Sequence, residues 1–597
     1  MATGVALVTS VALARAVVDV VTWHGDAART GLNANEKFLT TSNVNASSFG
    51  KLFNITVDGK VDVQPLYLSF LNIQGALHNV VIIATEHDSI YAADADTGTI
   101  YWQKTMLPTG EVPSDDRGCS QVTPEIGITG TPAIDRNQGT NGTIYLIAMS
   151  KDGSGVYHQR LHALDLTTGV DLQTPVEVVA SYPGTGDNSS GGTVFFDSKQ
   201  YKARPGLVDY NGNIYTYWGS HCDFRPYTGW IISYDKNTLA QTSVLDLAPN
   251  GNDNSLWNSG AAPALDPSGN QYQLVANGSF ETTLDGNGFP SGQDFGNCYI
   301  KLSSMLPIKV TDYWTMFNTV SESDGDQDLG SGGAMVLPDM TDAGGHIRHL
   351  TVGAGKDTHI YLADRDNMGK FNSASNSTLY QDLGAGVIQR CFSSPAYFNG
   401  HVYFGGVTDN VKEFTFTNAR LSATPTSKSA VTFPYPGTTP TISANGTGNA
   451  IVWCMYNGTT AALYAYDATN LASRLYTSND ASGSRDNFGA GNKFIVPTVA
   501  NGKVFAATTN SVAVFGLLNP PQPVSVRAKS IARNGSSVTV TIDGTTNFEY
   551  QLQRAGSLPS AFSNIGTGQT GTTGSAITFT DNSPPAGMAF YRIVVGP

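Results

Sequence analysis

A short phrase recurs along this chain: a strand, then Asp, two intervening residues, Thr-Gly, and another strand. The clearest copy, IYAADADTGTIYW, spans residues 90–102, and a second copy, LHALDLTTGVDLQ, spans residues 161–173. Weaker copies begin at Ser233, Tyr361 and Tyr464. A repeat of tens of residues that is built of strands and turns is typical of a β-propeller or a solenoid. The repeat therefore predicts an all-β architecture, but architecture alone does not indicate a function.

Eight segments have the pattern expected of the inner strand that begins a propeller blade, often introduced by a small residue or by proline. They are residues 64–67, 131–134, 204–207, 262–265, 333–336, 394–397, a degraded copy near Ile442, and 496–499. The last predicted blade ends near residue 518 and is one strand short. Residues 50–57, GKLFNITV, can supply this outer strand, and closing the ring with both chain ends removes exposed sheet edges.

The two clear copies of the phrase carry a recognisable docking motif, Ala-x-Asp-x-x-Thr-Gly-x-x-x-Trp. The first copy fits it with Ala92, Asp94, Thr97, Gly98 and Trp102. The second copy fits it with Ala163, Asp165, Thr168 and Gly169, but Gln173 replaces the tryptophan. On these residues the chain resembles the quinoprotein alcohol-dehydrogenase-like family of eight-bladed propellers with PQQ-type repeats, over roughly residues 50–518. The resemblance implies an eight-bladed β-propeller, which we place at 23–518, and a structural role for the motif.

Composition favours an extracellular protein. Only 14% of the residues are charged, whereas Gly (64) and Pro (28) are plentiful, and the net charge is −14. The acidic balance argues against nucleic acid as a partner. No apolar run approaches the roughly 20 residues that span a bilayer, so we expect no membrane span. The five widely spaced cysteines never form CxxC, which leaves either long-range disulfides or buried free thiols.

A proline-rich linker, residues 519–523, separates the predicted propeller from a C-terminal module at 524–597. Six segments of this module have the pattern of strands, in an order like that of an immunoglobulin or fibronectin β-sandwich. We find no segment for the seventh strand of that fold. A sandwich that lacks its last strand would keep an open edge and an uncovered core.

The first residues have the alternation of a strand that could fill such a gap. Within the predicted N-terminal strand and linker (1–22), larger side chains alternate with small ones, and the larger ones are Val5, Leu7, Thr9, Val11 and Leu13. The alternative is a secretory signal peptide, since Ala14-Arg15-Ala16 imitates a cleavage site. We favour the strand because no Lys or Arg precedes the apolar run.

The family resemblance implies PQQ bound above a tryptophan floor with Ca²⁺ as the natural cofactor of an enzyme. The chain has no adjacent cysteine pair and no CxxCH haem site, and no motif assigns a catalytic Asp or calcium ligands. We therefore predict no cofactor and no catalytic residue, with PQQ and Ca²⁺ as the alternative. The Asp- and Asn-rich stretches at 285–297 and 321–333 do not match an EF-hand, and we interpret them as turns.

Four polar residues form a candidate ligand cluster on the channel face: His87, Glu125, His221 and Asp223. Propellers bind ligands at the channel mouth, so these side chains could form a metal or acid/base site there. The alternative is hydrogen bonding between blades, and the absence of any metal-ligand spacing favours that alternative.

The leading hypothesis is an extracellular, non-catalytic structural protein that polymerises. The N-terminal strand of one subunit would complete the sandwich of the next, as in donor-strand exchange, which gives a head-to-tail, pilus-like filament with itself as the partner. One alternative is a secreted propeller enzyme, either PQQ-dependent or carbohydrate-active. Another is a monomeric adhesive or carbohydrate-binding protein, with cell-surface glycans as partners, whose N-terminus folds back onto its own sandwich.

Overall fold

The computed structural model describes residues 5–7, 18–520, 528–545, 548–557, 562–572, 574–585 and 588–596. These residues divide into two compact units. The larger unit comprises residues 19–34 and 39–517, and the smaller comprises residues 1–18, 35–38 and 518–597 in its described parts. Both units are built of β-strands, and the larger one also has short helical turns and one helix, α1 (Thr319–Asp324).

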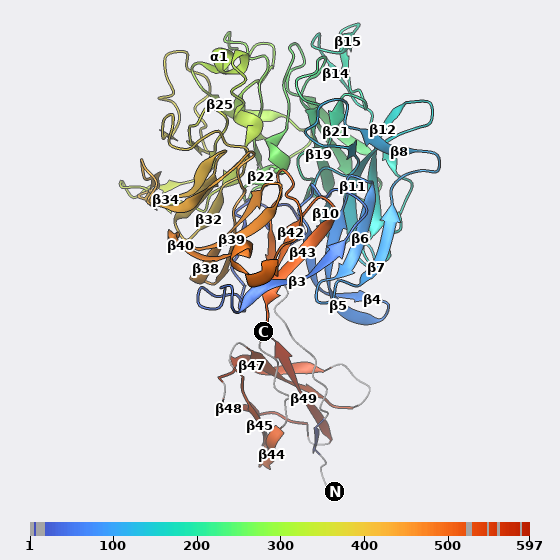
Figure 1. Ribbon diagram of the computed structural model, residues 1–597, viewed down its shortest axis with the longest axis vertical. Helices are drawn as coiled ribbons and strands as arrows, with labels where there is room; N and C mark the ends of the chain where they lie inside the picture. Colours follow the sequence, from blue (N-terminus) through green and yellow to red (C-terminus); the bar gives the residue numbers. More distant parts are fainter. Residues whose placement is uncertain are drawn as a thin grey trace. The chain divides into compact units, whose positions relative to one another are not determined.

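The larger unit is a β-propeller with eight blades in its described residues, each a sheet of four or more strands (Figure 1). Blade 1 contains β4 (Leu66–Ile73), β5 (Ala76–Ala84), β6 (Ser89–Asp94) and β7 (Ile100–Thr105), and blade 2 contains β10 (Ala133–Asp135), β11 (Thr143–Lys151), β12 (Tyr157–Asp165) and β13 (Val176–Glu177). Blade 3 contains β18 (Val208–Tyr210), β19 (Asn213–Ser220), β20 (Trp230–Asp235) and β21 (Gln241–Asp246), and blade 4 contains β22 (Ala264–Leu265), β23 (Gln271–Leu274), β24 (Cys298–Leu302) and β25 (Val310–Thr315).

Blade 5 contains β26 (Met335–Val336), β29 (Leu350–Gly353), β30 (Tyr361–Asp364) and β31 (Gln381–Asp382), and blade 6 contains β32 (Ala396–Phe398), β33 (His401–Gly405), β34 (Asp409–Thr417), β35 (Arg420–Leu421) and β36 (Ser427–Phe433). Blade 7 contains β37 (Thr441–Asn445), β38 (Gly448–Asn457), β39 (Ala461–Asp467) and β40 (Asn470–Thr477), and blade 8 contains β41 (Thr498–Ala500), β42 (Lys503–Ala507), β43 (Ser511–Leu517) and β3 (Phe49–Thr56).

Additional short strands decorate the blades. They are β2 (Leu32–Asn33) on blade 7, β8 (Val112–Asp115) and β9 (Glu125–Ile126) on blade 2, β17 (Tyr201–Lys202) on blade 3, the small sheet β14 (Ser181–Pro183), β15 (Ser189–Ser190) and β16 (Thr193–Phe195), and the hairpin of β27 (Met340–Thr341) and β28 (Ile347–Arg348).

The ring closes as the sequence predicts. Strand β3 pairs antiparallel with β43 from Phe49–Leu517 to Thr56–Ser511, and Figure 1 shows β3 in blue beside β43 in orange. Blade 8 therefore joins the first and last parts of the propeller. Seven of the eight predicted inner strands begin within the expected segment; in blade 3 the strand begins at Val208, just after residues 204–207.

The docking motif builds a turn and a contact between blades. The carboxylate of Asp94 accepts hydrogen bonds from the backbone N–H groups of Asp96 and Thr97, each at 2.8 Å. Gly98 follows with a φ of +79°, a conformation that glycine adopts without strain. The indole of Trp102 packs on blade 2 so closely that a Cβ on Gly169 would lie 2.6 Å from it.

Residues 20–33, which we call the N-terminal plug, cross one end of the propeller channel. The plug hydrogen-bonds to one residue in each of seven inner strands, through backbone groups in six of them and through the Asn33 side-chain amide in the seventh. The residues contacted are Tyr67, Ile134, Leu265, Val336, Tyr397, Ile442 and Val499. In the remaining blade, Trp23 lies against Gly206, where a Cβ would be 3.1 Å from the Trp23 Cβ. The plug therefore touches all eight blades.

Buried polar groups hold the plug in its bent path. Arg29 is 1% exposed, and its guanidinium donates to the backbone oxygens of Pro263, Trp23 and Asp26 at 2.8–2.9 Å and to the Thr22 hydroxyl at 2.8 Å. Burial lowers the pKa of Arg29 to about 10, so it stays charged at neutral pH. A buried cation with a full set of acceptors fixes the chain in one conformation.

The smaller unit is a two-layer β-sandwich. One sheet contains β44 (Ala528–Asn534), β45 (Ser537–Asp543) and β48 (Ala576–Asp581); the other has the order β1 (Val5–Leu7), β49 (Ala589–Gly596), β46 (Glu549–Ala555), β47 (Ser563–Thr570). Strand β45 alternates buried and partly buried residues, which places Val538, Val540 and Ile542 in the core.

The N-terminal strand pairs with the last strand of its own chain. Val5, Ala6 and Leu7 are parallel partners of Ala589, Phe590 and Tyr591. This pairing is the intramolecular arrangement that the sequence analysis lists as an alternative to exchange between subunits. The other residues of the predicted assembly strand, Thr9, Val11 and Leu13, lie outside the described residues.

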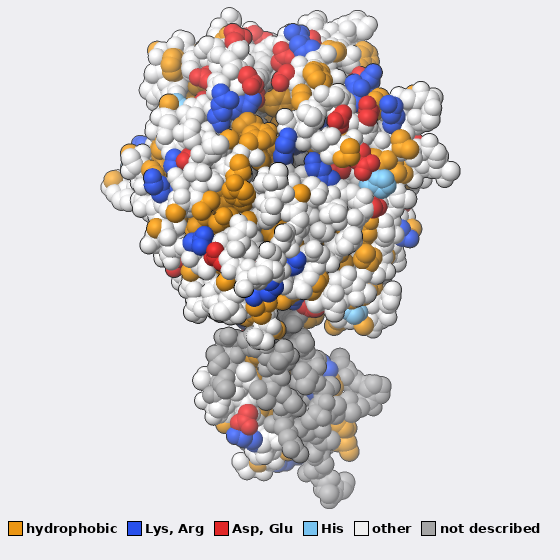
Figure 2. Space-filling view, in the orientation of Figure 1, with side chains coloured by type: hydrophobic (Ala, Val, Ile, Leu, Met, Phe, Trp, Pro, Cys, Tyr) orange, Lys and Arg blue, Asp and Glu red, His pale blue; other side chains and the backbone are white. Residues whose placement is uncertain are grey.

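The surface agrees with the low charge of the chain. Lys and Arg side chains are interspersed with Asp and Glu on the propeller face seen in Figure 2. In the described part of the chain, no helix is long and apolar enough to span a membrane.

Candidate functional site

Eight residues occupy equivalent positions in the eight blades, each two positions before the first residue of an inner strand, and we call them the ring. They are Gln64, Thr131, Gly206, Ala262, Gly333, Ser394, Thr439 and Val496. The plug contacts residues three positions after this ring. Side chains two positions before the ring belong to the opposite end of the channel, which we call the channel mouth.

A cavity of about 120 Å³ lies at the channel mouth. Four of its lining residues, Arg204, Ser331, Phe392 and Phe494, each stand two positions before a ring residue. The remaining lining residues are Gln121, Lys202, Ser220, Cys222, Asp223, Trp257, Ser259, Asp328, Lys356 and Tyr435. We call this cavity the mouth pocket.

Two buried cations of the mouth pocket have no anionic partner. Lys202 is 2% exposed and Arg204 is 6% exposed, and neither forms an ion pair or a side-chain hydrogen bond with any described residue. Strand β17 positions Lys202 by pairing it with Gly219, and the Arg204 N–H donates to the Lys202 carbonyl at 2.9 Å. The resulting tight turn brings both side chains to one cavity. Burying a charge without a partner is unfavourable, so this arrangement is a strong sign of an anionic ligand.

The surrounding charges compensate this pair only in part. Burial and the neighbouring Arg204 together lower the pKa of Lys202 to about 7, against the weaker effects of Glu86 and Asp62. Burial and the neighbouring Asp62 raise the pKa of Glu86 well above its ordinary value, which weakens this carboxyl as a counter-charge for Lys202 and Arg204. By contrast, the third cation, Lys356, lies 2.5 Å from the Asp328 carboxylate and 2.6 Å from that of Asp326.

Aromatic rings form one wall of the mouth pocket. Tyr435 meets Phe392 edge to face with ring centroids 5.3 Å apart, and it meets Phe494 in the same way at 6.5 Å. The Arg204 guanidinium carbon lies 4.2 Å from the Phe494 ring centroid. This cation–π contact holds Arg204 in place without neutralising its charge. The pocket thus offers positive charge beside an apolar wall.

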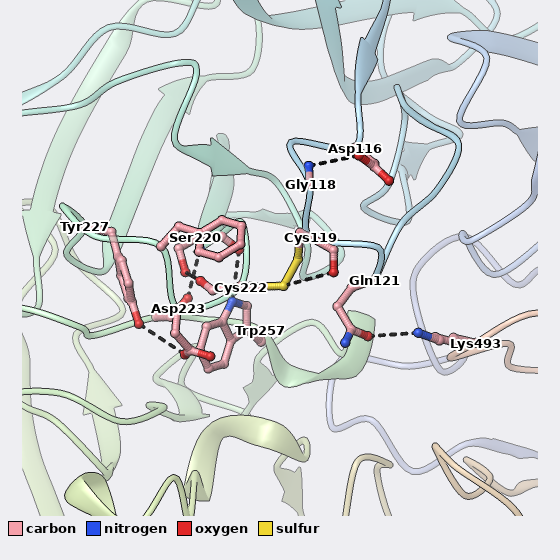
Figure 3. The surroundings of a disulfide bond; sticks show 12 residues. Asp116, Gly118, Cys119, Gln121, Ser220, Cys222, Asp223, Tyr227, Trp257 and Lys493 are labelled. Carbon is pink, nitrogen blue, oxygen red and sulfur yellow. Dashed lines mark hydrogen bonds between the residues drawn. A yellow bond between two sulfur atoms is a disulfide. The ribbon is translucent and has the colours of Figure 1, made fainter.

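A disulfide lies beside the mouth pocket. Cys119, between β8 and β9, is bonded to Cys222, which follows β19, and so links the edges of blades 2 and 3. Figure 3 shows this bond beside Trp257, whose indole N–H donates to the Ser220 carbonyl at 3.1 Å. The other cysteines, Cys298, Cys391 and Cys454, are free and buried. The sequence left the pairing open.

A larger, acidic basin of about 680 Å³ adjoins the mouth pocket, and Asp223 lines both. The basin contains five further carboxylates, at Asp253, Glu281, Asp294, Asp324 and Asp326, with Arg225 as its one cation among the lining residues. Burial and Glu281 raise the pKa of Asp294 to about 8. The basin and the mouth pocket therefore favour ligand groups of opposite charge.

The structure separates the predicted channel-face cluster. His87 Nδ1 lies 3.0 Å from Glu125 Oε1, and this pair does not line the mouth pocket. Asp223 lines the pocket and accepts a hydrogen bond from the Tyr227 hydroxyl at 3.4 Å. His221 is 1% exposed, and burial lowers its pKa well below the usual value. No three His, Cys, Asp or Glu side chains gather to hold a metal ion within the described ranges.

Lys202 and Arg204, the central residues of the pocket, are not among the predicted site residues. Arg204 is part of a predicted blade opening, but its chemical role is not visible there. The position of Arg204 in the repeat could have identified it, because side chains two residues before the ring residues face the channel mouth. Among those eight positions, Arg204 is the only basic residue.

Comparisons with solved structures support the propeller fold. Quinohemoprotein alcohol dehydrogenase from Comamonas testosteroni is similar with a TM-score of 0.55 and 12% identity, over 87% of this chain and 83% of that chain. Quinohemoprotein alcohol dehydrogenase ADHIIG from Pseudomonas putida HK5 has the same TM-score and identity, over 85% of this chain and 82% of that one. Neither the protein-family models nor the curated proteins give a sequence match. The chain therefore has the PQQ-type propeller fold, and at 12% identity the likeness concerns the fold alone.

The mouth pocket does not fit PQQ with Ca²⁺. Its volume of about 120 Å³ is below the roughly 300–1,000 Å³ of typical ligand pockets, whereas PQQ is a tricyclic tricarboxylate. The larger basin beside it is lined by carboxylates that would repel such a ligand. The described residues also offer no group of three His, Cys, Asp or Glu side chains that could hold a metal ion.

The first prediction concerns the charge state of Lys202. Its pKa is about 10.5 when unfolded and about 7 when folded, so folding disfavours the charged amine below pH 10.5. The free energy of unfolding of the native protein should therefore increase as the pH rises from 7 to 10.5, because Lys202 then destabilises the folded state less. We expect Lys202→Met to raise the free energy of unfolding by about 2–4 kcal/mol at pH 6 and by almost nothing at pH 10.5.

Calorimetric unfolding at both pH values, with Lys309→Met as the matched exposed-lysine control, measures this effect. An equal difference between Lys202→Met and the native protein at both pH values would contradict it.

Proposed function

We propose that the protein binds a small carboxylate-containing compound in the mouth pocket, with Lys202 and Arg204 as the anion-binding residues. The observation that carries the proposal is that both cations are buried and lack an anionic partner in the described chain. Arg binds carboxylates in a planar, two-point manner, and Lys adds a point charge. The cavity volume suits a compound of a few non-hydrogen atoms.

This proposal favours the enzyme alternative over the filament. The similar solved structures are described as dehydrogenases, and ligands of propellers bind at the channel mouth. Because the pocket does not fit PQQ, we do not assign quinone chemistry to it. An extracellular location remains part of the proposal, and the Cys119–Cys222 disulfide supports it because such bonds persist in oxidising compartments.

The second prediction is that small carboxylates bind at Lys202 and Arg204. Titration calorimetry with acetate and glycolate should show binding at pH 6. Both Lys202→Met and Arg204→Met should weaken it at least tenfold, because each removes one of two charges that face the anion in a low-dielectric site. Affinity should fall as the pH rises through about 7, where Lys202 loses its proton.

Lys309→Met, which removes an exposed charge, should leave the affinity unchanged. Equal affinity in the native protein and both pocket variants would exclude the proposed site.

Self-assembly by strand exchange is the second candidate function. It would use the pairing of β1 with β49, which adds a strand to the sandwich at the edge of β49 that β46 leaves open. In the structure this pairing joins parts of one chain. The same backbone hydrogen bonds would form if β1 came from another copy, and the contact would then propagate head to tail into a filament. The proposal includes the interpretation of this module as an immunoglobulin-like domain.

The third prediction concerns this strand. If subunits exchange it, deletion of residues 1–16 should abolish filaments seen by negative-stain microscopy, while the thermal transition of the propeller stays unchanged. A synthetic peptide of residues 1–16 should then raise the melting temperature of the sandwich in the truncated protein, because it restores the strand beside β49. Native protein that stays monomeric at high concentration, with its sandwich destabilised by the deletion, would show that the strand acts within one chain.

A further inference from the structure

The mouth pocket differs from a simple anion site because the Lys202 amine in it has no bonding partner. Its nitrogen forms no hydrogen bond and no ion pair with any described residue, although the side chain is 2% exposed. A lysine that only binds an anion works best when fully charged, and Lys356 in the same pocket is held in that state by two carboxylates. Lys202 has no such support.

The surroundings of Lys202 favour a neutral, nucleophilic amine. The side chain is desolvated, and the adjacent cation Arg204 faces the same cavity. Burial beside another cation is the environment that activates lysine amines for attack on carbonyl groups. Arg204 disfavours the proton on Lys202, whereas Glu86 and Asp62 favour it, and burial outweighs these two carboxyl groups. His221 also lies near Lys202, and the same cavity is lined by Asp223, Asp328, Lys356 and Tyr435.

We propose that Lys202 is a nucleophile that forms an imine with a small 2-oxo acid, whose carboxylate binds Arg204. This inference rests on the proposed function, since it assigns the class of carboxylate that the pocket binds. A 2-oxo acid carries its carbonyl carbon next to the carboxylate. The neighbouring positions of Lys202 and Arg204 at one cavity match these two adjacent groups.

The proposed step balances without a co-reactant. The nitrogen lone pair of neutral Lys202 attacks the carbonyl carbon and forms a C–N bond, while the C=O π electrons move to oxygen. One N–H proton is transferred to this oxygen and gives the carbinolamine. The hydroxyl then leaves with the second N–H proton as water, and a C=N bond forms. Once protonated, this imine withdraws electrons from the adjacent carbon. That property suits the making or breaking of a bond at that carbon, as in lyases and decarboxylases that use lysine.

The size and the walls of the pocket limit the substrate. A cavity of about 120 Å³ holds a short 2-oxo acid, and the rings of Phe392, Tyr435 and Phe494 give the carbon chain an apolar surface. Cys222 of the disulfide and Trp257 also line the cavity, and Figure 3 shows them side by side.

Reductive trapping tests this proposal directly. The full-length protein is incubated with pyruvate and sodium cyanoborohydride at pH 7.5, and the site of modification is mapped by peptide mass spectrometry. We expect one stable adduct, the reduced imine on Lys202, at a yield that saturates with pyruvate concentration. Lactate, which lacks the carbonyl group, should give no adduct. Arg204→Met should lower the yield at least tenfold at subsaturating pyruvate, and Lys309→Met should not change it.

Lys202→Arg separates the two proposals. This variant keeps a positive charge, so it should still bind carboxylates in calorimetry, but a guanidinium forms no imine and the adduct should disappear. Carboxylate binding in the native protein without any adduct on Lys202 would overturn the imine proposal and leave the proposed function intact. Absence of both would overturn the two together. Modification spread over exposed lysines, unaffected by Lys202→Arg, would also overturn the imine proposal.

Discussion

The backbone hydrogen bonds between the N-terminal plug and the inner strands are the constraint on which the rest of the propeller depends. Each contact reaches the same position, three residues after the ring, in seven blades, and Trp23 packs against the eighth. Each such bond contributes on the order of 1 kcal/mol, but together they tie all blades to one segment. Because the plug closes one end of the channel, the polar side chains that precede the ring are left to form a pocket at the other end.

The mouth pocket is unusual in what it leaves unpaired. The other buried Arg side chains of the described propeller have clear partners: Arg29 donates to four oxygens, and Arg365 forms an ion pair with Asp266. Lys202 and Arg204 have neither, although Glu86 and Asp62 are near enough to affect their pKa values. A fold that stabilises its other buried charges and leaves two together without an anion points to a ligand as the missing partner.

Most of the fold could be predicted from the sequence, because strands, Asp-x-x-Thr-Gly turns and blade openings are encoded locally. The closing role of residues 50–57 also follows from pattern, since an unpaired strand edge needs a partner. The site could not be predicted in the same way. Arg204 and Phe494 are 290 positions apart, and only the closed ring brings them to one cavity. The predicted cluster of His87, Glu125, His221 and Asp223 rested on residue type alone, and the structure pairs the first two residues with each other instead.

The central claim is that Lys202 and Arg204 form an anion site at the channel mouth. The most direct measurement is a crystal structure from crystals soaked in bromide, with anomalous scattering used to locate the ion. The account predicts a bromide peak within hydrogen-bonding distance of both the Lys202 amine and the Arg204 guanidinium. A structure in which Glu86 or Asp62 forms an ion pair with either side chain, with bromide peaks only at the outer surface, would contradict it.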